Sequence, residues 1–134
     1  MIAADTSVVV AAFATWHESH HLARRALRPG TRLIAQCALE AYSVLTRLPS
    51  PHRAAGQLVA QFLAERFPEE YLVLDARALR ALLGRLPALG ITGGASYDAV
   101  IGATAVHAGA TLLTFDRRAA GTYQQSGCEL RLLV

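Results

Sequence analysis

The fold is decided by the first ten residues, Met1-Ile2-Ala3-Ala4-Asp5-Thr6-Ser7-Val8-Val9-Val10. Residues 1–4 form a short apolar run that ends at an acid, which is typical of a buried strand. Residues 6–14 continue apolar, and Thr6 or Ser7 is available to cap a first helix. The stretch therefore predicts a strand, an acid at its carboxyl end and a helix directly behind it.

The rest of the chain repeats this alternation. We expect further strands at residues 33–35, 71–74, 111–115 and 130–134, and helices at 18–27, 36–48, 52–66, 76–86 and 96–108, with a short helical stretch after Asp116. Such alternation is typical of a parallel sheet covered by helices on both faces. No repeat, linker or low-complexity tract interrupts it. The sequence predicts one α/β domain over residues 1–134, a three-layer α/β/α fold with a central, mainly parallel sheet of about five strands.

The basic residues are all arginine. The chain has 13 Lys and Arg together, every one an Arg, with a net charge of +3 and a pI of about 9.3. This charge favours a polyanionic partner, although a genomic bias toward Arg and Ala explains it equally well. The absence of Lys excludes a phosphate-binding GxxxxGK[ST] loop. It also disfavours response-regulator and haloacid-dehalogenase domains, which normally use an active-site Lys.

No apolar run reaches the ~20 residues of a membrane span, and no basic segment precedes the first apolar stretch as in a secretory signal. We therefore expect a cytoplasmic protein without membrane contact. Cys37 and Cys128 lie far apart with no CxxC spacing. We interpret them as small buried hydrophobic residues, not as a disulfide or a zinc site.

Four acids occupy positions where ligand sites form in α/β proteins, outside the carboxyl ends of the strands. Asp5 and Asp116 each follow a predicted strand. Glu40 and Asp98 lie in the first turns of predicted helices.

Asp98 is the most informative acid, because Ile101, Gly102 and Ala105 share its side of the helix. A carboxylate on such an apolar stripe is costly to bury unless it is neutralised, paired or coordinated.

Each of these acids also has a purely structural explanation. Asp5 could cap the first helix, and Asp98 could be a first-turn acid that satisfies the helix dipole. Glu40 could be solvated or a neighbour of Arg47, and Asp116 could be a turn residue. If instead the four converge, their mutual repulsion requires a cation. A set of oxygen ligands without His or Cys indicates Mg²⁺, with Mn²⁺ as an alternative.

The residues around these acids resemble the PIN-domain ribonucleases, specifically the VapC toxins of prokaryotic toxin–antitoxin pairs. The resemblance covers essentially the whole chain and depends on four stretches in order: residues 2–10 (IAADTSVVV), 38–42 (ALEAY), 96–105 (SYDAVIGATA) and 112–119 (LLTFDRRA). It implies a PIN-like fold and hydrolysis of RNA phosphodiester bonds by a metal-activated water.

The resemblance also implies residue roles. Asp5 and Asp98 are expected as the principal metal ligands, with Asp116 and Glu40 completing the acidic pocket. Ser7 and Thr114 match positions where the family often has a small hydroxyl beside the acids, although capping and strand-end roles are as plausible.

The partners that the resemblance implies are an RNA substrate, a second copy of the chain in a homodimer, and a cognate VapB-type antitoxin in a heterotetramer or larger complex. The alternative is a PIN-like RNA-binding or regulatory module without catalysis.

Residues outside the acidic set have weaker signals. Arg117 and Arg118 are candidate phosphate contacts, with surface solvation as the equal alternative. His17, with His20 and His21, is expected in a solvated or RNA-facing loop. Trp16 could stack on a base or anchor the loop or a dimer contact.

Overall fold

The computed structural model describes all 134 residues of the chain. Its centre is a four-stranded parallel sheet in the order β2-β1-β3-β4. The strands are β1 (Ile2–Ala4), β2 (Arg32–Leu33), β3 (Thr111–Thr114) and β4 (Leu130–Leu132). The first and third strands, far apart in sequence, are the central pair, so the acids that follow them emerge side by side.

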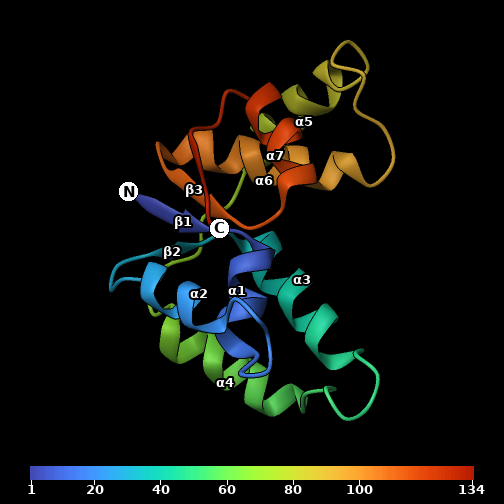
Figure 1. The fold of residues 1–134 in the computed structure, drawn as a ribbon. Coiled ribbons are helices and arrows are strands. Elements are labelled where there is room, and N and C mark those ends of the chain that lie inside the picture. The colour runs from blue at the N-terminus through green and yellow to red at the C-terminus, as the bar shows by residue number, and fades with distance from the viewer.

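Seven helices pack against the sheet, and Figure 1 shows that they form layers on its two sides. On one side of the sheet lie α1 (Thr6–Phe13), α2 (His20–Ala26), α3 (Ala35–Thr46) and α4 (Gly56–Arg66). On the other side lie α5 (Ala76–Arg85), α6 (Ala95–Ala108) and α7 (Arg117–Gln125). The predicted three-layer α/β/α architecture is therefore confirmed. None of these helices is both long and apolar enough to cross a membrane.

The prediction of about five strands was slightly wrong. The segment at residues 71–74 contributes only one isolated bridge, from Leu72 to Ile34. Its backbone exchanges two hydrogen bonds with the chain at the end of β2, Leu72 N–H to Leu33 O and Ala35 N–H to Leu72 O, each 2.9 Å. β2 itself is only two residues long and leads directly into α3. The pairing stops there because the neighbour has become a helix, and the 64% exposure of Val73 fits an open edge.

Of the candidate caps of the first helix, the structure selects Asp5. Neither Thr6 nor Ser7 is the N-cap of α1; Asp5 is, and its side chain accepts a hydrogen bond from the Val8 N–H. The helix begins one residue earlier than a Thr6 cap would allow. Both hydroxyls are consequently free to contact carboxylates.

The core is built around α1 and the two central strands. Val8, Val9, Ala3 and Leu112 are completely buried. A second, smaller cluster that includes Leu82, Leu86, Ile91 and Ala99 joins α5 to α6. α1 and α6 pack on opposite sides of the sheet, and Asp5, the N-cap of α1, and Asp98 of α6 line a common cavity.

Candidate active site

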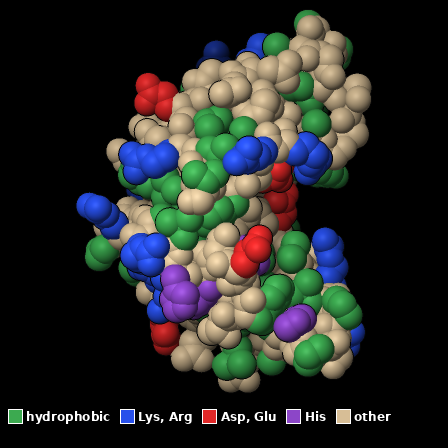
Figure 2. All heavy atoms as spheres, in the orientation of Figure 1, with side chains coloured by type: hydrophobic (Ala, Val, Ile, Leu, Met, Phe, Trp, Pro, Cys, Tyr) green, Lys and Arg blue, Asp and Glu red, His purple; other side chains and the backbone are tan.

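All four predicted acids line one cavity of about 340 Å³ at the carboxyl ends of the central strands. Asp5 follows β1 and Asp116 follows β3, whereas Glu40 comes from α3 and Asp98 from α6. Figure 2 shows acidic side chains at the narrowing between the two groups of helices, with basic side chains beside them. The fold therefore gathers four acids that are up to 111 positions apart, from Asp5 to Asp116, in the sequence.

Asp5 is the most buried of the four, with 2% of its surface exposed. Its Oδ1 accepts hydrogen bonds from the Ser7 hydroxyl at 2.5 Å and the Val8 N–H at 3.2 Å. Its Oδ2 accepts one from the Tyr123 hydroxyl at 3.0 Å. Burial raises the pKa of Asp5 above its usual value, and the hydrogen bonds from Ser7, Tyr123 and Val8 oppose that rise.

Ser7 and Thr114 connect the two central strand ends. The Ser7 oxygen accepts a hydrogen bond from the Phe115 N–H at 2.9 Å while it donates to Asp5. The Thr114 oxygen accepts one from the Asp116 N–H at 2.9 Å and lies 3.5 Å from the Ser7 oxygen. The two hydroxyls thus fix the backbone after β3 relative to Asp5. Both hydroxyls therefore lie beside the acids.

Asp116 is the N-cap of α7. Its Oδ1 accepts hydrogen bonds from the Arg118 and Ala119 N–H groups, both at 3.0 Å. The Arg118 guanidinium lies 3.7 Å from Oδ2 and lines the cavity with it. Arg117 is exposed and does not line the cavity. Of the two predicted phosphate contacts, only Arg118 lies where the acids meet.

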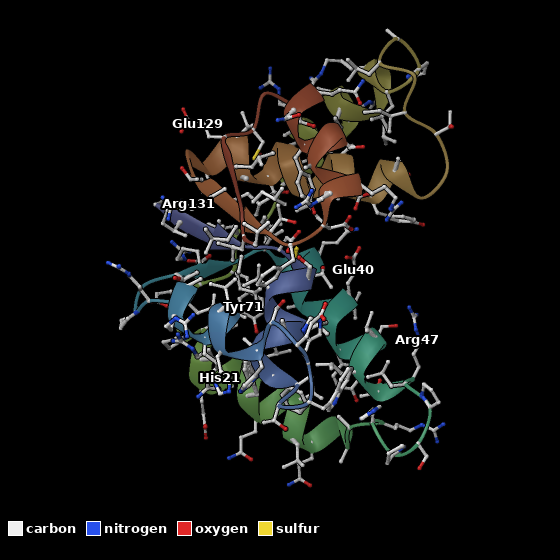
Figure 3. The ribbon with its side chains drawn as sticks, viewed as in Figure 1. His21, Glu40, Arg47, Tyr71, Glu129 and Arg131 are labelled. Carbon is white, nitrogen blue, oxygen red and sulfur yellow. The ribbon has the colours of Figure 1, made fainter.

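Glu40 points into the cavity and not toward solvent or Arg47. Its carboxylate accepts hydrogen bonds from the Thr6 hydroxyl at 2.7 Å and the Gln36 amide at 3.1 Å. Arg47 instead donates to Ser43 at 3.1 Å, and Figure 3 shows it farther along α3, away from Glu40.

Asp98 has no partner of its own. None of the side-chain hydrogen bonds or ion pairs of the structure involves its carboxylate. Partial burial raises its pKa above the usual value; Arg118 opposes the rise, and the carboxylates of Asp116, Glu40 and Asp5 add to it. Asp98 is therefore a half-buried carboxylate without a partner, near three others. A cation bound beside it would offset both the cost of burying its charge and the repulsion from the other carboxylates.

The acids do not form a preformed cage. No three His, Cys, Asp or Glu side chains are close enough together to hold a metal ion as they stand. The donors that the cavity offers are carboxylate oxygens, the chemistry that Mg²⁺ and Mn²⁺ prefer. Mg²⁺ typically uses one or two carboxylates and completes its shell with water and substrate phosphate. The residues present fit such an ion.

Sequence reasoning missed two side chains of the cavity. Tyr123 is 2% exposed, and burial together with the nearby Asp5 carboxylate raises its pKa, so it stays a hydrogen-bond donor. Its signal was the spacing of seven residues from Asp116, two helical turns along α7. His17 also lines the cavity. It comes from the loop between α1 and α2, and its position depends on the path of that loop.

Similarity to known proteins identifies the family of the chain. The model of the PIN domain family matches residues 2–124, so the chain belongs to the PIN-domain family, and its relatives lie in the VapC group. It is 54% identical to the protein named Ribonuclease VapC40 of Mycobacterium tuberculosis strain H37Rv, over the full length of both chains. It is 39% identical to Ribonuclease VapC27 of the same strain, over 94% of this chain and 92% of the relative.

Proposed function

We propose that the chain is a metal-dependent endoribonuclease that hydrolyses phosphodiester bonds of RNA. The observation that carries the proposal is the convergence of Asp5, Glu40, Asp98 and Asp116 from four separate elements on one cavity. The relatives support it, because both are named ribonucleases. The net charge of +3, contributed by arginine, suits a polyanionic substrate.

The cavity acids are the proposed ligands of Mg²⁺ or Mn²⁺. Asp98 offers both of its oxygens, while Asp5, Glu40 and Asp116 have hydrogen bonds that leave part of their capacity free. When bound there, the ion supplies a Lewis acid that neutralises phosphate charge and lowers the pKa of an attacking water.

The other groups position these acids and the substrate. Ser7 and Tyr123 hold the Asp5 carboxylate from its two oxygens. Arg118 is mostly exposed beside Asp116, so its guanidinium is available to a substrate phosphate. Its donors lie at the mouth of the acidic cavity, where they offset the repulsion between phosphate and carboxylates.

The biological setting proposed is that of a toxin. Because its relatives bear the VapC name, we propose that the chain acts on cytoplasmic RNA and is inhibited by a cognate VapB-type antitoxin. We also propose a homodimer that forms a heterotetramer or larger complex with the antitoxin. Light scattering of the protein, with and without the product of an adjacent small reading frame, tests both assemblies.

One observation favours a non-catalytic RNA-binding module instead. No three acids are poised to hold a metal, and Asp5 and Asp116 both serve as helix caps. In that case the protein binds RNA but leaves it intact with every metal.

The deciding experiment titrates Mg²⁺ and Mn²⁺ against total RNA with the wild type, Asp98→Asn and Asp75→Asn. Asp75 is a matched control, because it is an exposed helix N-cap outside the cavity and Asn caps equally well. We expect metal-dependent cleavage by the wild type and Asp75→Asn, reduced at least about 100-fold in Asp98→Asn. RNA binding without cleavage by the wild type at all metal concentrations overturns the proposal in favour of the binding module.

A further inference from the structure

A second hollow is lined in part by the α1–α2 loop, which also contributes His17 to the acidic cavity. It has a volume of about 340 Å³ and is lined on one side by residues 13–16 and on the other by residues 51–55, with Leu58. Phe13 forms its floor, packed edge to face against Phe62 of α4 with ring centroids 5.4 Å apart. Phe13 is therefore a structural anchor and does not offer a free face.

Trp16 forms the exposed wall of this hollow. It is 48% exposed, and its ring lies over that of His52 with centroids 4.2 Å apart and an interplanar angle of 32°. Exposure of half of a tryptophan on a loop is costly in water, since the indole is the largest apolar surface a side chain can offer. The His17 ring also lies near the indole, with centroids 5.9 Å apart and an interplanar angle of 39°. The two histidines fix the indole, and its exposed half remains available to a planar partner.

The charge of the hollow is positive. Arg53 donates from Nε to the Leu48 carbonyl at 2.9 Å, which fixes its guanidinium, and it makes no ion pair. Its remaining N–H donors have no protein acceptor. None of the residues that line the hollow is an acid. A ligand that combines a flat ring with a negative group matches these two features.

The adjacent residue connects the hollow to the acids. His17 lines the acidic cavity, and its Nδ1 accepts a hydrogen bond from the Ser19 N–H at 3.0 Å. This bond places the proton of the neutral ring on Nε2, which has no protein partner. Trp16 and His17 are consecutive, so one loop presents an aromatic face to one site and a hydrogen-bond donor to the other.

We propose that this hollow is a subsite for one nucleotide of single-stranded RNA beside the cleaved bond, with the base on Trp16 and a phosphate on Arg53. The proposal rests on the proposed ribonuclease function and adds how the strand is held. Aromatic side chains bind single strands by stacking on bases, and arginine forks onto phosphate oxygens. His17 lies between the subsite and the acids, where its Nε2–H donates to an oxygen of the connecting sugar-phosphate.

The test uses the fact that Trp16 is the only tryptophan of the chain. Its fluorescence therefore reports on the subsite alone. Short single-stranded RNA is titrated into the cleavage-deficient Asp98→Asn protein, and binding is measured in parallel by anisotropy of a labelled RNA. Stacking predicts that Trp16 emission is quenched with the same midpoint as the anisotropy change.

Variants separate stacking from charge. We expect Trp16→Ala to weaken RNA binding by roughly 5- to 150-fold and Trp16→Phe to recover most of it. Arg53→Ala should lower the slope of log affinity against log salt by about 0.7, the share of one phosphate contact on a single strand. Arg77→Ala is the charge-matched control, because Arg77 is an exposed arginine on α5 in the opposite helix layer. Its RNA affinity and salt dependence should change less than those of Arg53→Ala.

The outcomes distinguish the subsite from the function. RNA that is bound and cleaved without quenching, with Trp16→Ala like the wild type, overturns the subsite and leaves the function. Quenching without cleavage by the wild type supports the subsite and overturns the function. A blue shift of Trp16 emission with protein concentration in the absence of RNA means that a second copy covers it, and this also overturns the subsite.

Discussion

Tyr123→Phe removes a single oxygen from the interior of the site. Tyr123 is 2% exposed, and its hydroxyl donates to Asp5 Oδ2 over 3.0 Å. The hydrogen bonds from Ser7 and Val8 go to the other oxygen, Oδ1. Phe has the same ring, so no cavity of consequence is left. The substitution therefore measures the hydrogen bond to Asp5 and little else.

The magnitude depends on the charge of Asp5. A hydrogen bond to an ionised group is worth about 1.5–3 kcal/mol, and a neutral one about 0.5–1.5 kcal/mol. We expect the metal-free variant to lose about 2 kcal/mol of unfolding free energy where Asp5 is ionised and about 1 kcal/mol where it is protonated. For a chain of this size the larger loss lowers Tm by roughly 5–10 °C.

The sign of the pH dependence follows from linkage. Burial raises the pKa of Asp5 in the folded protein, so between the unfolded and folded pKa values the folded state binds more protons. The stability contributed by Asp5 consequently falls as pH rises through that interval. The Tyr123 hydrogen bond opposes the rise in pKa, so its removal raises the pKa of Asp5 further. The cost of Tyr123→Phe must then grow with pH.

Urea unfolding followed by circular dichroism, in a chelating buffer at about pH 5 and about pH 8, measures this cost. Tyr97→Phe is the matched control, because Tyr97 is exposed and its loss should stay within about 0.5 kcal/mol at both pH values. An equal cost for Tyr123→Phe at the two pH values, or a cost as small as that of the control, refutes the assignment of Tyr123 as the donor that holds an ionisable Asp5.

Three further substitutions test other contacts. Asp116→Asn keeps the cap of α7, so it should unfold like the wild type and lose only cleavage. Asp116→Ala removes the cap, so its free energy of unfolding in urea should be about 1 kcal/mol lower. Equal stability of the two variants contradicts the role of Asp116 as a cap. Gly102→Ala places a Cβ 3.3 Å from the Tyr123 Cα and 3.2 Å from the Ser126 side chain. The crowding should lower the free energy of unfolding by about 1–3 kcal/mol, although Ala has the better helix propensity. A stabilised variant contradicts this contact. Ser7→Ala leaves the Phe115 N–H and Asp5 each without one partner and should cost about 1–3 kcal/mol, with amide exchange at Phe115 accelerated as the readout that a simple packing defect leaves unchanged.

The fold was largely predictable because the spacing of apolar residues within each segment indicates whether that segment is a strand or a helix. Short apolar runs that end at Asp5 and Asp116 predicted the two central strands, and helical spacing predicted the helices on either side. The run at residues 71–74 has the composition of a strand, yet its pairing depends on how far β2 extends before α3 begins. The length of β2 cannot be inferred from the sequence of residues 71–74.

The candidate site was predictable where chemistry and position coincide. Asp5 and Asp116 follow strand ends and Asp98 lies in the first turn of α6, whereas Glu40 lies in the second turn of α3 because that helix begins at Ala35; all four line the cavity. The orientation of Glu40 was not predictable from its helix, because Thr6 and Gln36 decide it while Arg47 binds Ser43 instead. Tyr123 was missed because its partner is 118 positions away, and its spacing of seven residues from Asp116 points to the site only once the path of α7 is known.

The hydrogen bonds of the site indicate an order in which the acids are free to bind a cation. Asp5 and Asp116 cap helices that start directly behind the central strands, so backbone N–H groups and the positive helix ends hold these two carboxylates before any metal arrives. Each accepts two hydrogen bonds on one oxygen, which satisfies both lone pairs there. If these acids bind the proposed cation, the oxygen each has left to offer is Oδ2, which on Asp5 also accepts the Tyr123 hydrogen bond.

Neither carboxylate oxygen of Asp98 accepts a hydrogen bond from the protein. Asp98 lies on α6, whose close packing against α7 depends on Gly102. We therefore predict that the loss of Asp98 affects the proposed metal binding most and folding least. Asp5 is its counterpart, an acid whose replacement disturbs the folded state as well as the reaction. Comparing metal affinity by calorimetry with urea unfolding for Asp98→Asn and Asp5→Ala tests this division; a larger loss of stability in Asp98→Asn contradicts it.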